Sequence, residues 1–192
     1  ITIPASTLQS LINNLSDERT NLESDNNSLI IKSDNYEARI QGMNHDDFPL
    51  IPHIKNKDYY LKINGGLLRD ALVKVMSATQ YSDWRQELNG VLFDLSSNNL
   101  ILVATDSFRL ARKIIPKSQF ETNWNNEKII IPLKTVEELI RILDDNQVIN
   151  IYFDKNQIVF MDDDLEIISR VIDGKFPNYE AIIPQNFDTE MI

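Results

Sequence analysis

The sequence predicts an α+β fold built from repeats of one unit, a strand followed by a helix and then by three more strands. Three segments place apolar side chains at the i, i+3, i+4 and i+7 spacing of one helix face. Each segment follows a short extended run and precedes strand-like runs. In addition, the chain resembles itself at an offset of 128 residues. An internal repeat of this length sets the frame for the whole fold.

The three helices are expected to be short and amphipathic. Their apolar faces are Leu8, Leu11, Ile12 and Leu15; Leu68, Ala71, Leu72 and Val75; and Val136, Leu139, Ile140 and Leu143. The extended runs before them are residues 1–4, 59–63 and 128–132. Pro4 and Pro132 suit a first helical turn, where the missing N–H would have no partner in any case. Asn64 is a candidate cap for the second helix.

Strand-like runs follow the second and third helices. They comprise residues 90–95, 99–105, 108–115, 148–153, 157–161 and 165–171. The turn residues "SSNN" at 96–99, "DKN" at 154–156 and "DDD" at 162–164 predict hairpins between neighbouring runs.

The internal repeat predicts the domain organisation. Residues 1–17 match residues 129–145 at eight of seventeen positions, where ordinary residue frequencies would give about one. Two half-units make a domain of roughly 120 to 130 residues, which is a usual size. We therefore expect a half-domain at 1–56, a complete domain at 57–183 and the start of another at 184–192.

The same offset carries Phe48-Pro49 onto Phe176-Pro177, so both Phe-Pro loops are expected to connect domains. Proline would limit how such a connector swings. Since the chain opens at Ile1 without methionine and stops at Ile192, we expect it to be a piece of a longer protein.

Composition excludes several classes of function. A net charge of -10 argues against holding nucleic acid by bulk electrostatic attraction. The absence of cysteine removes disulfides, thiolate zinc sites and cysteine nucleophiles, and two histidines argue against an imidazole-rich metal site. With no run of eighteen apolar residues and no leader pattern, the expected compartment is the cytoplasm.

No pattern of catalytic residues stands out. There is no nucleophile with a base at a typical spacing, and five glycines form no phosphate-binding loop. Asp162, Asp163 and Asp164 could form a catalytic carboxylate site. An enzyme that uses this site is the weakest of the functional interpretations. A solvated hairpin turn is favoured, because Asp and Asn form turns through local hydrogen bonds.

Two other clusters leave alternatives open. Lys134 and Arg141 share the helix face opposite the apolar one. They could face a phosphate backbone, or Glu138 could pair with both, and the spacing favours the pairing. The large apolar residues Leu88, Phe108 and Leu110 lie near polar ones at strand edges. The sequence supports a partly wet groove and simple edge packing about equally.

Four motifs resemble the bacterial DNA polymerase III beta subunit family, the sliding clamps. They are "LNGVLFD", "VATDSFRLA", "IIIPLKTVEELIRILDD" and "SRVIDGKFPNYEAIIP", in this order. The resemblance implies the DNA clamp fold, with helices on one side of antiparallel sheets, and a protein without catalysis or cofactor. Two chains of three domains would close head to tail around double-stranded DNA. The implied partners are the DNA polymerase III alpha subunit, the clamp loader, other proteins with clamp-binding motifs and a second copy.

The resemblance also implies two sets of site residues. The peptide groove would lie between the second and third domains, and the wall from the third domain is absent from this chain. The half contributed by this chain would comprise Leu88, Thr105, Ser107, Phe108, Arg109, Leu110, Pro177, Ala181 and Ile182. The DNA-facing residues would be Arg85, Lys134 and Arg141. Family members often have histidine where Phe108 stands and arginine where Ala181 stands, so we expect a groove that is more apolar and less cationic. The alternative is a stand-alone acidic peptide-binding scaffold of clamp-like fold that does not encircle DNA.

Overall fold

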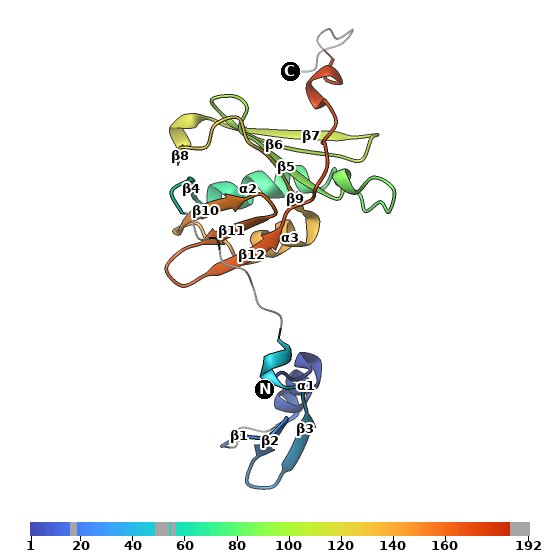
Figure 1. Ribbon diagram of the computed structural model, residues 1–192, viewed down its shortest axis with the longest axis vertical. Coiled ribbons are helices and arrows are strands. Elements are labelled where there is room, and N and C mark those ends of the chain that lie inside the picture. The colour runs from blue at the N-terminus through green and yellow to red at the C-terminus, as the bar shows by residue number, and fades with distance from the viewer. Residues whose placement is uncertain (16–18, 49–53, 55–56, 185–192) are drawn as a thin grey trace. The chain divides into compact units, whose positions relative to one another are not determined.

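The computed structural model describes residues 1–15, 19–48, 54 and 57–184. The chain divides into two compact units, Ile1–His53 and Ile54–Ile192 (Figure 1). Most of the first predicted connector beyond Phe48, and the expected domain start after Pro184, lie outside the described residues.

The first unit has one helix and one antiparallel sheet. Helix α1 (Ala5–Asn14) precedes β1 (Asn21–Asp25), β2 (Ser28–Lys32) and β3 (Glu37–Gln41), which pair in that order, and the 3-10 helix η1 (His45–Asp47). Pro4 is the residue before the helix rather than part of its first turn. None of the described residues of α1 is buried, whereas Ile31 and Ile40 of the sheet are. This unit therefore buries little apolar surface of its own.

The second unit repeats the predicted order twice. Its first half comprises β4 (Tyr60–Asn64), α2 (Gly65–Met76), η2 (Gln86–Leu88), β5 (Gly90–Asp94), β6 (Leu100–Thr105), β7 (Leu110–Ile115), η3 (Lys117–Gln119) and β8 (Phe120–Thr122). Its second half comprises β9 (Lys128–Pro132), α3 (Leu133–Ile142), β10 (Val148–Asp154), β11 (Gln157–Met161), β12 (Glu166–Arg170) and η4 (Tyr179–Ala181). The strand-helix-strand-strand-strand prediction is confirmed, and β8 is an addition to it.

The two halves exchange their first strands. The sheets have the orders β12-β11-β10-β4-β8 and β7-β6-β5-β9. Strand β4 pairs antiparallel with β10, with Leu61 opposite Ile151, and β9 pairs with β5, with Ile130 opposite Leu92. Each half therefore completes the sheet of the other, which joins the two halves into one domain.

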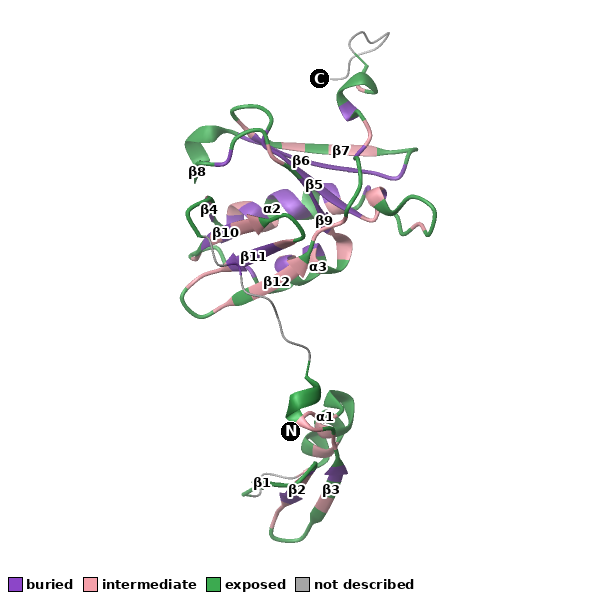
Figure 2. Cartoon of the chain, in the orientation of Figure 1, coloured by how far each residue is buried: buried purple, intermediate pink, exposed green. Residues whose placement is uncertain are grey.

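Helices α2 and α3 contact each other and strands of both sheets. Leu68 and Leu72 of α2 and Val136 and Leu139 of α3 are fully buried. Figure 2 shows buried segments on both helices. Full burial of each such side chain stabilises the fold by about 1.5 to 3 kcal/mol. The side chain of Asn64 accepts a hydrogen bond from the Leu67 N–H at 2.9 Å, which confirms the predicted cap. The apolar helix faces thus form the main core.

Candidate functional site

A cavity of about 200 Å³ lies beside the turn between β6 and β7. Its walls are Arg85, Thr105, Ser107, Phe108, Arg109, Leu110, Pro177 and Ile182. Seven of the nine residues predicted for the groove are among them. Pro177 and Ile182 belong to the segment after β12, so residues far apart in the sequence enclose the cavity together.

The carboxylate of Asp106 organises the β6–β7 turn. Its Oδ1 accepts the backbone N–H groups of Phe108 and Arg109 at 2.9 and 2.7 Å. Its Oδ2 accepts two bonds from the Arg109 guanidinium, at 2.9 and 2.8 Å. Ser107 has a left-handed backbone with φ of 77°, which costs energy for a residue with a Cβ. The bonds to Asp106 compensate for that cost and hold Phe108, 93% exposed, at the cavity rim.

The hydroxyl of Thr105 closes the same turn from the other strand. Its Oγ1 donates to the carbonyl of Arg109 at 2.7 Å and accepts the Ser107 N–H at 3.1 Å. Thr105 and Asp106 are both buried. The rim of the cavity is therefore a rigid turn rather than a loose loop.

These bonds predict a pH dependence of stability. The backbone and side-chain bonds from Arg109, with the backbone bond from Phe108, lower the pKa of Asp106 from 3.8 to about 2. Because the folded pKa is depressed, the stabilisation is complete above about pH 4 and is lost as the pH falls through about 2. We expect Asp106→Asn to lower the free energy of unfolding at pH 7. Denaturant unfolding should show this difference shrinking between pH 4 and 2; a constant difference would contradict the assignment.

Leu88 and Ala181 were predicted for the groove but do not line the cavity. Leu88 is buried in a cluster that we term the second apolar cluster. That cluster comprises Leu88, Leu92, Ile101, Val103, Ile130, Phe176 and Tyr179. Ala181 is exposed in η4, next to Ile182. Leu88 therefore belongs to a buried cluster against which the cavity residue Leu110 packs, and Ala181 directly precedes the cavity residue Ile182 in the chain.

Arg85, predicted from the resemblance to face DNA, lies at the cavity. Its guanidinium donates to the hydroxyl of Ser107 at 2.7 Å and to the carboxylate of Glu87 at 3.2 Å. Sequence reasoning missed this position, because Arg85 and Ser107 are 22 residues apart.

Helix α3 carries the other two predicted cations. Lys134 and Arg141 are both exposed. Arg141 donates two hydrogen bonds to Glu138 at 2.9 and 2.5 Å. Among the described residues, Lys134 has no ion pair. Glu138 was expected to pair with both cations if they do not face DNA; it pairs with Arg141 but not with Lys134.

The acidic run at 162–164 is a hairpin turn, as predicted. Asp162 Oδ1 accepts the N–H groups of Asp164 and Leu165 at 2.9 and 2.8 Å, and its Oδ2 accepts a bond from Gln147. Within the described residues, no three acidic, histidine or cysteine side chains gather as metal ligands would. In the same parts of the chain, no helix has the length and apolar character needed to span a membrane.

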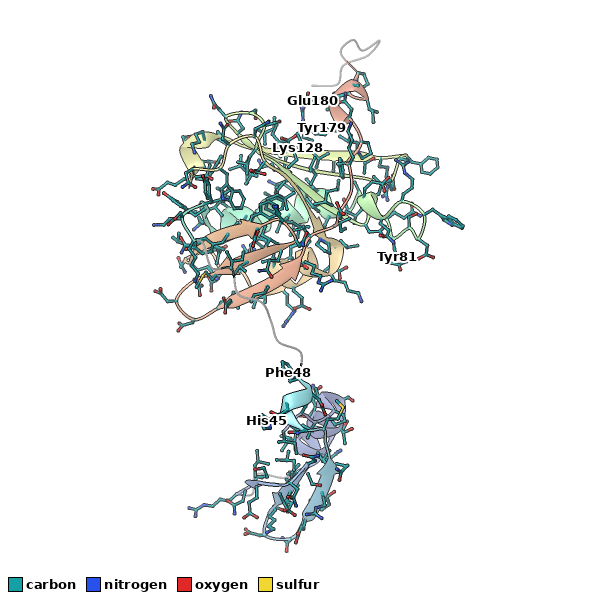
Figure 3. The ribbon with its side chains drawn as sticks, in the orientation of Figure 1. His45, Phe48, Tyr81, Lys128, Tyr179 and Glu180 are labelled. Carbon is teal, nitrogen blue, oxygen red and sulfur yellow. The ribbon has the colours of Figure 1, made fainter. Side chains whose placement is uncertain are left out.

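A second, larger cavity of about 510 Å³ was not predicted. It lies between Leu92 and Ile130 of the four-stranded sheet and residues 174–180 of the segment after β12. Figure 3 shows Tyr179 and Lys128 close together where this segment meets the sheet. The phenol of Tyr179 donates to Oδ2 of the buried Asp94 at 2.9 Å.

The carboxylate of Asp94 has two further partners. Lys128 Nζ lies 2.8 Å from its Oδ2, and the Ser96 N–H donates to its Oδ1 at 2.8 Å. Burial alone would raise the pKa of Asp94, but the bonds from Lys128, Ser96 and Tyr179 outweigh burial and lower it. Burial, followed by the bond to Asp94, raises the pKa of Tyr179 far above its ordinary value. Asp94 is therefore a charged acceptor, and the Tyr179 phenol remains a donor.

Comparison with known proteins identifies relatives over most of the chain. Residues 62–178 match the family described as DNA polymerase III beta subunit, central domain. The beta sliding clamp of Staphylococcus aureus is 32% identical over 163 residues, which are 84% of this chain and 42% of that protein. The chain thus spans less than half the length of that curated relative.

Solved structures show the same fold. The DNA polymerase III subunit beta of Pseudomonas aeruginosa has a TM-score of 0.84 and 25% identity, covering 97% of this chain and 50% of that one. The Helicobacter pylori beta clamp bound to a DNA ligase peptide also has a TM-score of 0.84 and 25% identity, covering 97% and 52%. The predicted clamp fold is confirmed.

Proposed function

Because this chain belongs to the DNA polymerase III beta subunit family, we propose that it is part of a sliding clamp. Such a clamp is a ring that encircles double-stranded DNA and tethers a polymerase to it. The cavity beside the β6–β7 turn carries the proposal, since it combines apolar walls with a rigid polar turn at the exposed rim. In this role the protein performs no reaction and needs no cofactor; it holds enzymes on DNA in the cytoplasm.

The proposed domains follow the internal repeat. Residues 1–56 would be the second half of the first clamp domain, 57–183 the complete second domain and 184–192 the start of the third. The match of residues 62–178 to the central domain of the family supports the middle assignment. The full-length protein would close into a ring with a second copy, head to tail.

The proposed groove takes a short peptide with apolar anchor residues. Leu110, Pro177 and Ile182 give its walls their apolar character, and Phe108 adds an exposed aromatic ring at the rim. Anchor side chains that fill such pockets usually dominate binding energy. The partners would be the DNA polymerase III alpha subunit, the clamp loader and other proteins with clamp-binding motifs. The ligase peptide bound to the Helicobacter pylori clamp supports this mode of recognition.

The proposed DNA-facing residues are Lys134 and Arg141 on α3, and Arg85. A ring that slides needs weak and non-specific phosphate contacts, for which a few exposed cations suffice. Arg85 has a second candidate role, because its bond to Ser107 joins it to the groove.

The direct test of the groove is a titration with a fluorescently labelled copy of the DNA ligase peptide named above. We expect saturable binding, measured by fluorescence anisotropy, that unlabelled peptide reverses. No binding by the folded full-length protein would overturn the groove assignment.

A further inference from the structure

The segment that follows β12, residues 171–184, will be called the connector. It is held to the four-stranded sheet near its beginning and near its end. At the beginning, the Ile172 N–H donates to the carbonyl of Ile130 at 2.9 Å. Further along, Phe176 and Tyr179 are buried in the second apolar cluster. The connector therefore has a defined path over the sheet.

The connector also borders the larger cavity. Residues 174–180 line this cavity of about 510 Å³ together with Leu92, Lys128 and Ile130. Where a cavity replaces packed atoms, the side chains around it lose dispersion contacts. A directional contact there would add to the packing that holds the backbone.

The bond from Tyr179 to Asp94 is such a contact. Asp94 is fully buried on β5, and Tyr179 is 2% exposed. A hydrogen bond to a buried charged acceptor is stronger than one between neutral groups. Lys128 adds to the arrangement, because its ammonium contacts Asp94 and lies 5.9 Å from the centre of the Tyr179 ring.

The anchored residue is joined directly to the groove. The carbonyl of Tyr179 accepts the N–H of Ile182 at 3.2 Å, which closes the turn of η4. Ile182 lines the small cavity. Pro177, two residues before Tyr179, borders both cavities. Any movement of Tyr179 away from the sheet would therefore shift both connector residues of the groove wall.

We propose that Tyr179, held by Asp94 and Lys128, is a positioning residue that sets the connector wall of the peptide groove. Its side chain lines the larger cavity and not the small one, and it acts through the backbone of Pro177 and Ile182. The inference rests on the proposed peptide-binding function. Tyr179 and Asp94 are 85 positions apart in the sequence, so sequence patterns do not reveal that they interact.

The test is Tyr179→Phe, which removes one oxygen atom and retains the ring. We expect its affinity for the labelled ligase peptide to fall about three- to tenfold. The matched control is Tyr59→Phe, the same change at an exposed tyrosine before β4. Its affinity should equal that of the unsubstituted chain.

A second measurement distinguishes a change in the position of the connector from a loss of stability of the whole domain. The chain has no cysteine, so nitroxide labels can be attached at Glu180→Cys in η4 and Lys155→Cys in the β10–β11 turn. We expect Tyr179→Phe to broaden the distance distribution between them at a temperature where the core remains folded, while Tyr59→Phe leaves it unchanged.

The outcomes distinguish the two proposals. If the unsubstituted full-length protein does not bind the peptide, the groove assignment fails. If it binds, and Tyr179→Phe binds equally well or keeps the same distance distribution, the positioning role of Tyr179 is wrong. Weaker binding together with a broader distribution supports that role.

Discussion

Leu110→Ala is expected to weaken binding of the ligase peptide by about tenfold or more. Leu110 begins β7 and lines the small cavity opposite the connector residues Pro177 and Ile182. Burying a leucine side chain against a ligand contributes on the order of 1.5 to 3 kcal/mol, which corresponds to roughly a 10- to 150-fold change in affinity. Isothermal titration calorimetry of the folded variant measures this loss.

The control for Leu110→Ala is Ile114→Ala. Ile114 lies on the same strand, is partly exposed and does not border the cavity. We expect the peptide affinity of this variant to remain within about twofold, the effect of an ordinary surface substitution. Equal affinity of the Leu110 variant and the unsubstituted protein, or an equal loss in both variants, would contradict the groove assignment.

Reversing two charges on α3, with Lys134→Glu and Arg141→Glu, is expected to shorten polymerase products on a primed template. Each reversal replaces attraction to phosphate by repulsion, and both side chains are exposed. The change also removes the bond from Arg141 to Glu138. Surface ion pairs contribute about 0 to 1 kcal/mol, so the fold should persist. Product length at low salt measures the effect, because salt screens phosphate attraction.

A matched double variant tests whether position matters. Lys155→Glu and Arg170→Glu change the net charge by the same amount, at exposed positions in the β10–β11 turn and at the end of β12. This protein should support the same product lengths as the unsubstituted clamp. Equal lengths for all three proteins would count against a DNA-facing role for Lys134 and Arg141.

Local patterns predicted much of the fold. The apolar spacing in α2 and α3, the Asn64 cap and the hairpin turn at Asp162 each depend on residues within a few positions of one another. Strand β8 was missed because three residues are too few to show alternation. The exchange of β4 and β9 between sheets depends on pairing across the whole domain, which periodicity does not reveal.

The candidate site also combines features that depend on neighbouring residues with features that depend on residues far apart in the sequence. The turn containing Asp106 is local, and its motif singled out Phe108 and Leu110. Leu88 looked like a strand-edge residue, but the connector and the sheet bury it together. Asp94 and Tyr179 are 85 positions apart in the sequence, and only the path of the connector over the sheet brings them into hydrogen-bond contact.

We propose that the full-length protein containing this chain encloses DNA. Encirclement can be measured as retention of the protein on nicked circular plasmid, after loading by a clamp loader, before and after the plasmid is linearised. We expect the protein to stay on circular DNA through gel filtration and to be lost once the DNA has free ends. Equal retention on both forms, or none on the circle while the ligase peptide still binds, would contradict encirclement and favour the peptide-binding scaffold.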